Sequence, residues 1–247
     1  AADAADDAAA RRKFPTHCPQ EHQFCNAMDA QDQALATALA SALSTDATAR
    51  AAAESVLLAS AEAAGHCGRL LRCSLLPQLP DAARLLAATQ LRGQIQRRWR
   101  GGGRGIPADE RPALKAALAE TILRDEPHEA VATQLALACA RVMRAEANKG
   151  EADVLHAFLH ALRRRPQPAQ ALLAVLHTAK EWSTMRLPAQ RQLAARVAVA
   201  LLPELEAPWA AAVDAVATAG ADSAPHQLRL AALHTKVLRQ LLERLAD

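Results

Sequence analysis

Apolar residues recur three or four positions apart along most of this chain, which is the spacing of one face of an α-helix. Leu35, Leu39 and Leu43 form the first such stripe. Ser44-Thr45-Asp46 follows it, a run of residue types that favour helix starts because their side chains accept hydrogen bonds from free backbone N–H groups. The pattern therefore predicts one helix around residues 35–43 and the start of another directly after residue 46.

The second helix is predicted over residues 47–63, with Val56 and Leu57 facing inward. Gly65 is expected to end it, because glycine readily adopts the left-handed conformation that closes many helices. The two helices form a pair joined by a short connection. Such a pair buries only one face by itself, so neighbouring pairs must stack to complete a core.

Four further helix pairs follow the same pattern. Asp81 is expected to cap the long helix that closes at Trp99. The fifth pair is predicted over residues 189–205 and 227–245, with a longer connection that contains Ala, Gly and Asp. The inward-facing residues expected in the second to fourth pairs are Cys67, Leu70, Leu71 and Leu75, then Leu114, Leu118, Ile122, Val131, Leu135, Cys139 and Val142, then Val154, Leu155, Phe158, Leu159, Leu162, Leu172, Leu173 and Leu176.

Two short sequences recur within the chain. Ala88-Thr89-Gln90-Leu91 returns letter for letter at residues 132–135, and the LAVLHT sequence at 173–178 returns as LAALHT at 230–235. Recurrence of this kind is typical of repeat proteins, in which each unit packs only on its neighbours. The sequence therefore predicts an all-α fold, a HEAT-repeat α-solenoid of about five antiparallel helix pairs, whose surface would bind partners.

Composition supports this fold class and argues against several functions. Of the 247 residues 51% are hydrophobic, but only 2% are aromatic and none is tyrosine, which favours helices over strands. The formal net charge of +3 falls short of the basic stripe of a dedicated nucleic-acid binder. Five cysteines without paired spacing favour reduced thiols. No apolar run is long enough to cross a membrane, so neither membrane insertion nor direct nucleic-acid binding is expected.

The N-terminal residues differ in character from the rest. Residues 1–27 are interpreted as a low-complexity, disordered tail and residues 28–247 as the repeat domain, with Met28 as the hypothesised physiological start. The tail contains four residue types that zinc prefers, but their spacing fits no standard arrangement. Metals and other cofactors are therefore not expected. The four residues are His17, Cys18, His22 and Cys25.

Other residues that could carry chemistry have structural interpretations. The Gly-Gly-Gly-Arg-Gly sequence at 101–105 lacks the Lys-Ser/Thr ending of a phosphate-binding loop and follows no strand, so it is interpreted as an inter-repeat loop. His177 and His234 occupy equivalent repeat positions, which favours a structural role such as capping a neighbouring loop. No nucleophile and base set is recognisable, so the chain is not expected to be an enzyme.

An arginine run marks the end of the helix that closes at Trp99. It could contact the acidic surface of a partner, or it could be a solvated helix end whose alkyl stems lie on apolar surface. The run comprises Arg92, Arg97, Arg98, Arg100 and Arg104.

Residues along most of the chain carry a family resemblance. They are Asp46, Arg50, Ala53 and Leu57; Asp81, Arg84, Ala87 and the QIQRRW sequence ending at Trp99; residues 107–111 with Leu114; residues 132–142; and Leu172, Leu173, His177, Lys180, Arg186, Leu187, Ala189 and Arg191. On the basis of these residues, positions 28–245 resemble the N-terminal region of the importin-β (karyopherin) family, closest to its importin-eleven branch. Arg92-Gly93 departs from the usual Lys-Asn, and residues 148–151 replace the usual Trp-Pro pair.

The resemblance implies a nuclear transport receptor, or its N-terminal fragment, that supports nucleocytoplasmic protein transport. Its implied partners are the GTP form of the Ran GTPase and protein cargo, with FG nucleoporins as further candidates, and its implied location is the nucleus, the cytoplasm and the nuclear pore. Ran contacts are expected on the second helices of the first three pairs, with Arg92, Arg97 and Arg98 as the candidate Ran-binding residues. The alternatives are a HEAT-repeat scaffold subunit without transport activity and, third, an α-helical enzyme.

Overall fold

The computed structural model describes residues 29–246 except 101–104, 125, 147–151 and 165–166. The predicted tail at 1–27, the start at Met28 and most of the glycine-rich loop therefore lie outside the described residues. Eleven helices and no strands are found in the described part. They are α2 (Ala30–Ser41), α3 (Ala47–Ser60), α4 (His66–Leu75), α5 (Asp81–Arg98), α6 (Glu110–Thr121), α7 (Glu129–Glu146), α8 (Ala152–Arg163), α9 (Ala169–Ser183), α10 (Pro188–Leu201), α11 (Pro203–Thr218) and α12 (Ala224–Ala246).

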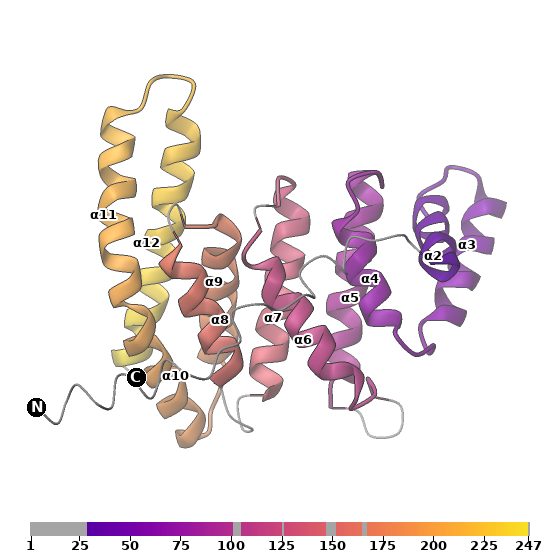
Figure 1. Cartoon of the computed structure of the whole chain (residues 1–247), viewed down its shortest axis with the longest axis horizontal. Coiled ribbons are helices and arrows are strands. Elements are labelled where there is room, and N and C mark those ends of the chain that lie inside the picture. The colour runs from indigo at the N-terminus through magenta and orange to yellow at the C-terminus, as the bar shows by residue number, and fades with distance from the viewer. Residues whose placement is uncertain (1–28, 101–104, 125, 147–151, 165–166, 247) are drawn as a thin grey trace, which may run out of the picture.

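The helices stand side by side in a row that runs from α2 and α3 to α11 and α12 (Figure 1). From the second pair on, the second helix of each pair packs on the second helix of the next, α5 on α7, α7 on α9 and α9 on α12, while the first pair contacts α4 and α5 through α2. Contacts at their C-terminal ends show that these helices run parallel, since Trp99 reaches Glu146 and Arg144 reaches Glu181. The predicted all-α HEAT-repeat solenoid is confirmed.

Of the two N-cap residues predicted from the sequence, one is observed and the other is not. The Asp46 carboxylate accepts a hydrogen bond from the Thr48 N–H at 2.8 Å and so caps α3 as predicted. The prediction that Asp81 caps α5 was wrong, because Pro80 occupies the cap position and Asp81 is the first helical residue. Its carboxylate accepts instead from Arg84 Nη1 at 3.0 Å.

Gly65 also has a different place from the one predicted. Helix α3 ends at Ser60, and Gly65, with φ of 72°, stands immediately before α4. The Gly65 N–H donates to Glu110 Oε1 at 2.9 Å, which ties the start of α4 to the start of α6. The left-handed residue thus turns the chain into the second pair rather than closing the first.

The core consists mainly of the predicted leucine, valine and cysteine positions, buried between successive helix pairs. Two predictions for the first pair were wrong, since Leu43 and Val56 are each 48% exposed. Leu43 follows the end of α2 at Ser41 and so leaves its stripe, while on α3 the adjacent Leu57 is the buried residue. Among the described residues, α3 packs mainly on α2, which leaves much of its surface exposed.

The fifth unit contains three helices rather than the two predicted. The segment expected to be a long connection holds α11, which packs against α12 and contacts α8 and α10. Only Leu205 and Ala212 of α11 are buried, so the helix has almost no apolar stripe. Pro203 and Pro208 further weaken the helical pattern of this sequence. A proline in the first turn, such as Pro203, costs the helix little stability.

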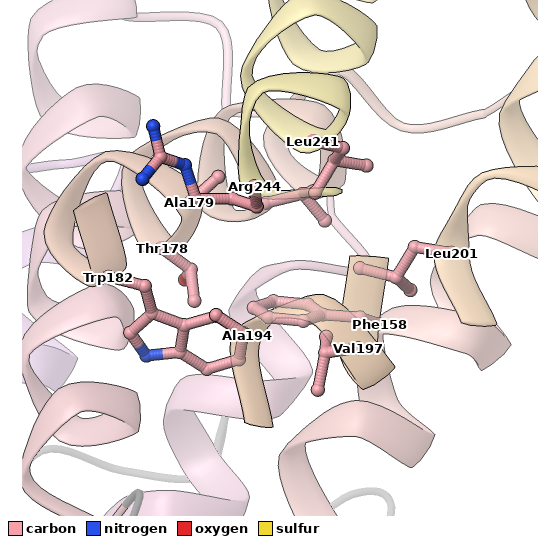
Figure 2. Close-up of a pocket in the computed structure, with 10 residues that line it drawn as sticks. Phe158, Thr178, Ala179, Trp182, Ala194, Val197, Leu201, Leu241 and Arg244 are labelled. Atoms are coloured by element: carbon pink, nitrogen blue, oxygen red, sulfur yellow. The ribbon is translucent and has the colours of Figure 1, made fainter. Parts of the chain in front are cut away.

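A small cavity lies between α12 and the fourth helix pair, α8 and α9. Figure 2 shows Phe158 and Trp182 facing Val197, with Leu241 and Arg244 of α12 on the other side. Its volume of about 10 Å³ is roughly the space of one water molecule. The cavity is therefore a packing feature and too small for a ligand. Among the described residues, no helix is long and apolar enough to cross a bilayer.

Candidate binding groove

A groove of about 340 Å³ lies at the C-terminal ends of α5 and α7. A volume of this size is within the range of small-ligand sites. Four arginines line it, two from the end of the α5 segment and two from α7. The lining residues are Ile95, Gln96, Arg97, Trp99, Arg100, Arg141, Arg144, Ala145, Met185 and Gln190.

The wall between α5 and α7 is fixed by polar contacts at the helix ends. Trp99 is 2% exposed, and its indole Nε1 donates to Glu146 Oε1 at 2.7 Å. Arg100 Nε donates to the Ala145 carbonyl at 2.8 Å, and Arg100 Nη2 donates to the same oxygen. These hydrogen bonds satisfy the Ala145 carbonyl, one of the last carbonyls of α7, which lack a partner within the helix. They also hold the two helix ends together.

The opposite wall is built around one carboxylate. Glu181 of α9 accepts from Arg141 Nη1 at 2.8 Å and lies 3.3 Å from Arg144 Nη1. Arg144 Nη1 also donates to the Glu181 carbonyl at 2.9 Å and to the Thr184 hydroxyl. One carboxylate thus neutralises only one of these two guanidinium charges. Arg141 Nε is buried and has no acceptor among the described residues.

Arg97 is the most available of the four arginines. It is exposed, and it has no hydrogen bond or ion pair in the part of the chain that the structure describes. Its guanidinium lies back over Gly93, where a side-chain Cβ would stand 3.4 Å from Arg97 Nη1. A Cβ at position 93 would therefore be in van der Waals contact with the guanidinium of Arg97.

The structure separates the three predicted site residues. Arg97 lines the groove, whereas Arg98 points toward the first pair and its Nη1 donates to the Ala61 carbonyl at 2.5 Å. Arg92 is half-buried, and its Nε is enclosed without an acceptor in the described part. Successive helical residues are about 100° apart around the axis, so a run of arginines on one helix cannot share one face.

Sequence reasoning missed Arg141 and Arg144, although a signal for them was present. The two copies of Ala-Thr-Gln-Leu begin at Ala88 and Ala132, 44 positions apart. The same offset relates Arg97 to Arg141 and Arg100 to Arg144. The groove is thus formed by equivalent positions of two consecutive repeats, and the internal repeat could have located all four arginines.

Residues 53–124 match the family model of the importin-beta N-terminal domain. Over these residues the chain is similar to the importin-beta N-terminal domain. The predicted resemblance to the N-terminal region of the importin-β family is therefore confirmed for this segment. The family consists of non-enzymatic binding proteins, in agreement with the prediction that the chain is not an enzyme. The family model does not separate the importin-eleven branch from the other branches, so the assignment to that branch stays a prediction.

The fold is also similar to a solved structure titled "Structure of Lph2, a novel bidirectional nuclear transport receptor in S. cerevisiae". The two share 22% sequence identity with a TM-score of 0.73, and the match covers 85% of this chain and 21% of that one. At this identity the likeness shows the fold alone. No curated protein sequence matches the chain.

The residues that match the importin-beta N-terminal domain supply one half of the groove. The matched residues run from α3 to the end of α6 and include Arg97 and Arg100, whereas Arg141 and Arg144 lie beyond the match on α7. The groove therefore stands where the matched domain meets the next repeat of the solenoid.

Replacing Gly93 by Ala should raise the free energy of unfolding by about 0.5–1 kcal/mol, because glycine in a helix interior loses more backbone entropy than alanine. The new Cβ would meet only the flexible end of Arg97. Urea unfolding would measure the change. Gly65→Ala is the matched control with the opposite sign, since its φ of 72° strains any side chain. A Gly93→Ala protein less stable than the original would contradict the prediction.

Proposed function

We propose that the chain is the N-terminal part of an importin-like nuclear transport receptor, which binds GTP-bound Ran and supports nucleocytoplasmic protein transport. The importin-beta N-terminal domain at residues 53–124 carries this proposal. The continuous row of second helices from α5 to α12 supports it, because such a row offers an extended surface to a protein partner. Protein cargo and FG nucleoporins are the further proposed partners, and the nucleus, cytoplasm and nuclear pore the proposed locations.

Within this function, Arg92, Arg97 and Arg98 remain the proposed Ran contacts. They lie on α5, inside the matched domain. Arg97 is exposed and has the greatest freedom to meet a partner, while Arg98 would have to leave the Ala61 carbonyl to do so. Arg97 is accordingly expected to contribute most to binding.

Calorimetric titration of the full chain with Ran tests the proposal. Ran loaded with a non-hydrolysable GTP analogue should bind, and Ran loaded with GDP should bind at least tenfold more weakly. Replacing Arg92, Arg97 and Arg98 together by Gln should lower the affinity for the GTP form about fivefold, or about 1 kcal/mol. Arg50→Gln, an exposed arginine at the start of α3, is the matched control and should bind as the original does.

Equal binding to both nucleotide forms, or no binding to either, would contradict the receptor function. A stable stoichiometric complex that lacks Ran and nucleoporins, recovered by co-purification from cells, would then favour the alternative of a HEAT-repeat scaffold subunit. Unchanged affinity of the triple variant would instead move the Ran contact away from these three residues and leave the receptor function standing.

A further inference from the structure

We propose that the groove between α5 and α7 binds an extended, acidic segment of a protein partner. The inference concerns a ligand class that differs from folded Ran, and it does not depend on Ran binding. It rests on the convergence of four guanidinium groups, Arg97, Arg100, Arg141 and Arg144, in one hollow of about 340 Å³.

The first supporting observation is the repetition of the arginine pair. Arg97 lies in the last turn of α5 and Arg100 lies two residues after its end, while the equivalent Arg141 and Arg144 lie in the last turns of α7. Because α5 and α7 run parallel and pack together, the two pairs line one groove across the helices.

The second observation is the positive charge that the protein leaves unbalanced. Arg97 has no acidic partner in the described part of the chain, and Arg100 donates to a backbone carbonyl rather than to a carboxylate. Glu181 serves both Arg141 and Arg144. The Glu146 carboxylate accepts from the Trp99 indole. Four guanidinium groups thus face two carboxylates, so a ligand that enters the groove meets net positive charge.

The third observation concerns the chemistry of the ligand. Guanidinium groups bind carboxylates through paired N–H donors, which suits the side chains of Asp and Glu. Single-stranded nucleic acid would also need exposed aromatic faces for its bases. Trp99, the one aromatic among the described lining residues, is only 2% exposed, and its indole donates to Glu146. The groove therefore suits an acidic peptide better than a nucleic acid.

The shape of the groove indicates an extended ligand. Its lining continues from α5 and α7 to Met185, after α9, and to Gln190 on α10, so it runs across the helices rather than along one of them. A chain lying across successive repeats would place alternate acidic side chains near successive arginine pairs, since residues two apart in an extended chain are about 7 Å apart.

Fluorescence anisotropy with the full chain tests the proposal. The probe is a fluorescein-labelled eight-residue peptide of alternating Glu and Ser, compared with the same peptide carrying Gln in place of Glu. The acidic peptide should bind at low ionic strength and weaken as salt is added. The double substitution Arg97→Gln and Arg100→Gln should weaken its binding at least tenfold, whereas Arg50→Gln, on α3 and outside the groove lining, should leave it unchanged.

Arg97→Gln alone keeps the test decisive if the double variant folds poorly, because Arg97 makes no hydrogen bond or ion pair in the described part that its loss would break. It should weaken the peptide at least threefold while thermal unfolding stays as in the original. Equal binding of the Glu and Gln peptides would overturn the proposal, as would undiminished binding by both arginine variants. Tighter binding of an eight-nucleotide single strand than of the acidic peptide would assign the groove to nucleic acid instead.

The two proposals can fail separately. The peptide assay contains no Ran, so a negative result there does not bear on Ran binding. A negative Ran titration does not bear on the groove, since Arg92 and Arg98 lie outside the groove lining. The single variant Arg97→Gln, measured in both assays, shows whether the two ligands share this arginine.

Discussion

Replacing Arg84 by Met is expected to lower the free energy of unfolding by about 3–5 kcal/mol, because it leaves a buried carboxylate without its partner. The Arg84 side chain is 7% exposed and that of Glu126 is 8% exposed, with 2.5 Å between Nη2 and Oε2. Arg84 Nε also donates to the Ser74 carbonyl of α4 at 3.0 Å. One side chain therefore connects α4, α5 and the segment that leads into α7.

Two further variants separate the loss of the ion pair from the loss of packing. Replacing Arg84 by Met and Glu126 by Gln together should recover part of the stability, since no buried charge remains uncompensated. Arg50→Met changes an arginine that carries the same family resemblance in the first pair but is exposed, with only a 3.2 Å contact to the Ser44 carbonyl. It should change stability by less than about 0.5 kcal/mol.

Urea unfolding followed by circular dichroism measures all three variants. Stability of Arg84→Met within about 1 kcal/mol of the original would show that the buried pair contributes little. A double variant as unstable as Arg84→Met would show that the arginine acts through packing and the Ser74 carbonyl rather than through Glu126.

The repeat architecture was predictable from the sequence because periodicity and capping depend on local chemistry. Asp46 caps α3 as expected, and the leucines of α4 and α6 are buried where the 3.6-residue period places them. Helix α11 was missed because it buries only Leu205 and Ala212, so its sequence resembles a connection. A helix that buries so few side chains carries a weak apolar pattern.

The groove was less predictable, because its residues come from helices whose packing decides which arginines meet. Sequence proximity suggested Arg92, Arg97 and Arg98, yet only Arg97 lines the groove. The internal repeat offset relates Arg97 to Arg141 and is the better guide, since it connects residues that occupy one place in successive units. In a solenoid, a repeated position predicts a shared surface more reliably than a run of like residues does.

The same offset clarifies the departure at Arg92-Gly93. The position equivalent to Gly93 in the next repeat is Leu137, so the two second helices differ where Arg97 lies back over its own helix. A Cβ at position 93 would stand 3.4 Å from Arg97 Nη1, which is ordinary van der Waals contact. The departure at Gly93 therefore lies beside Arg97 but is not required for the position of that arginine.

His66 presents a second buried polar group, and this one has no partner. It is the first residue of α4 and is 3% exposed, and neither ring nitrogen has a hydrogen bond in the described part of the chain. Burial, followed by the positive charges of Arg69 and Arg98, lowers the pKa of His66 from 6.5 to about 4. The helix N-terminus opposes a cation in the same direction.

Lowering the pH from 7 to 5 is therefore expected to destabilise the fold through His66 by about 2 kcal/mol. The folded pKa is depressed, so between pH 6.5 and pH 4 the unfolded chain takes up a proton that folded His66 does not, and stability falls with pH across that window. His66→Gln cannot titrate and should lose about 2 kcal/mol less than the original between the two pH values in urea unfolding. His177, whose pKa is also lowered to about 4 by burial and Lys180, contributes equally to both proteins and cancels in the comparison. Equal losses in the two proteins would mean that folded His66 accepts its proton as readily as the unfolded chain does.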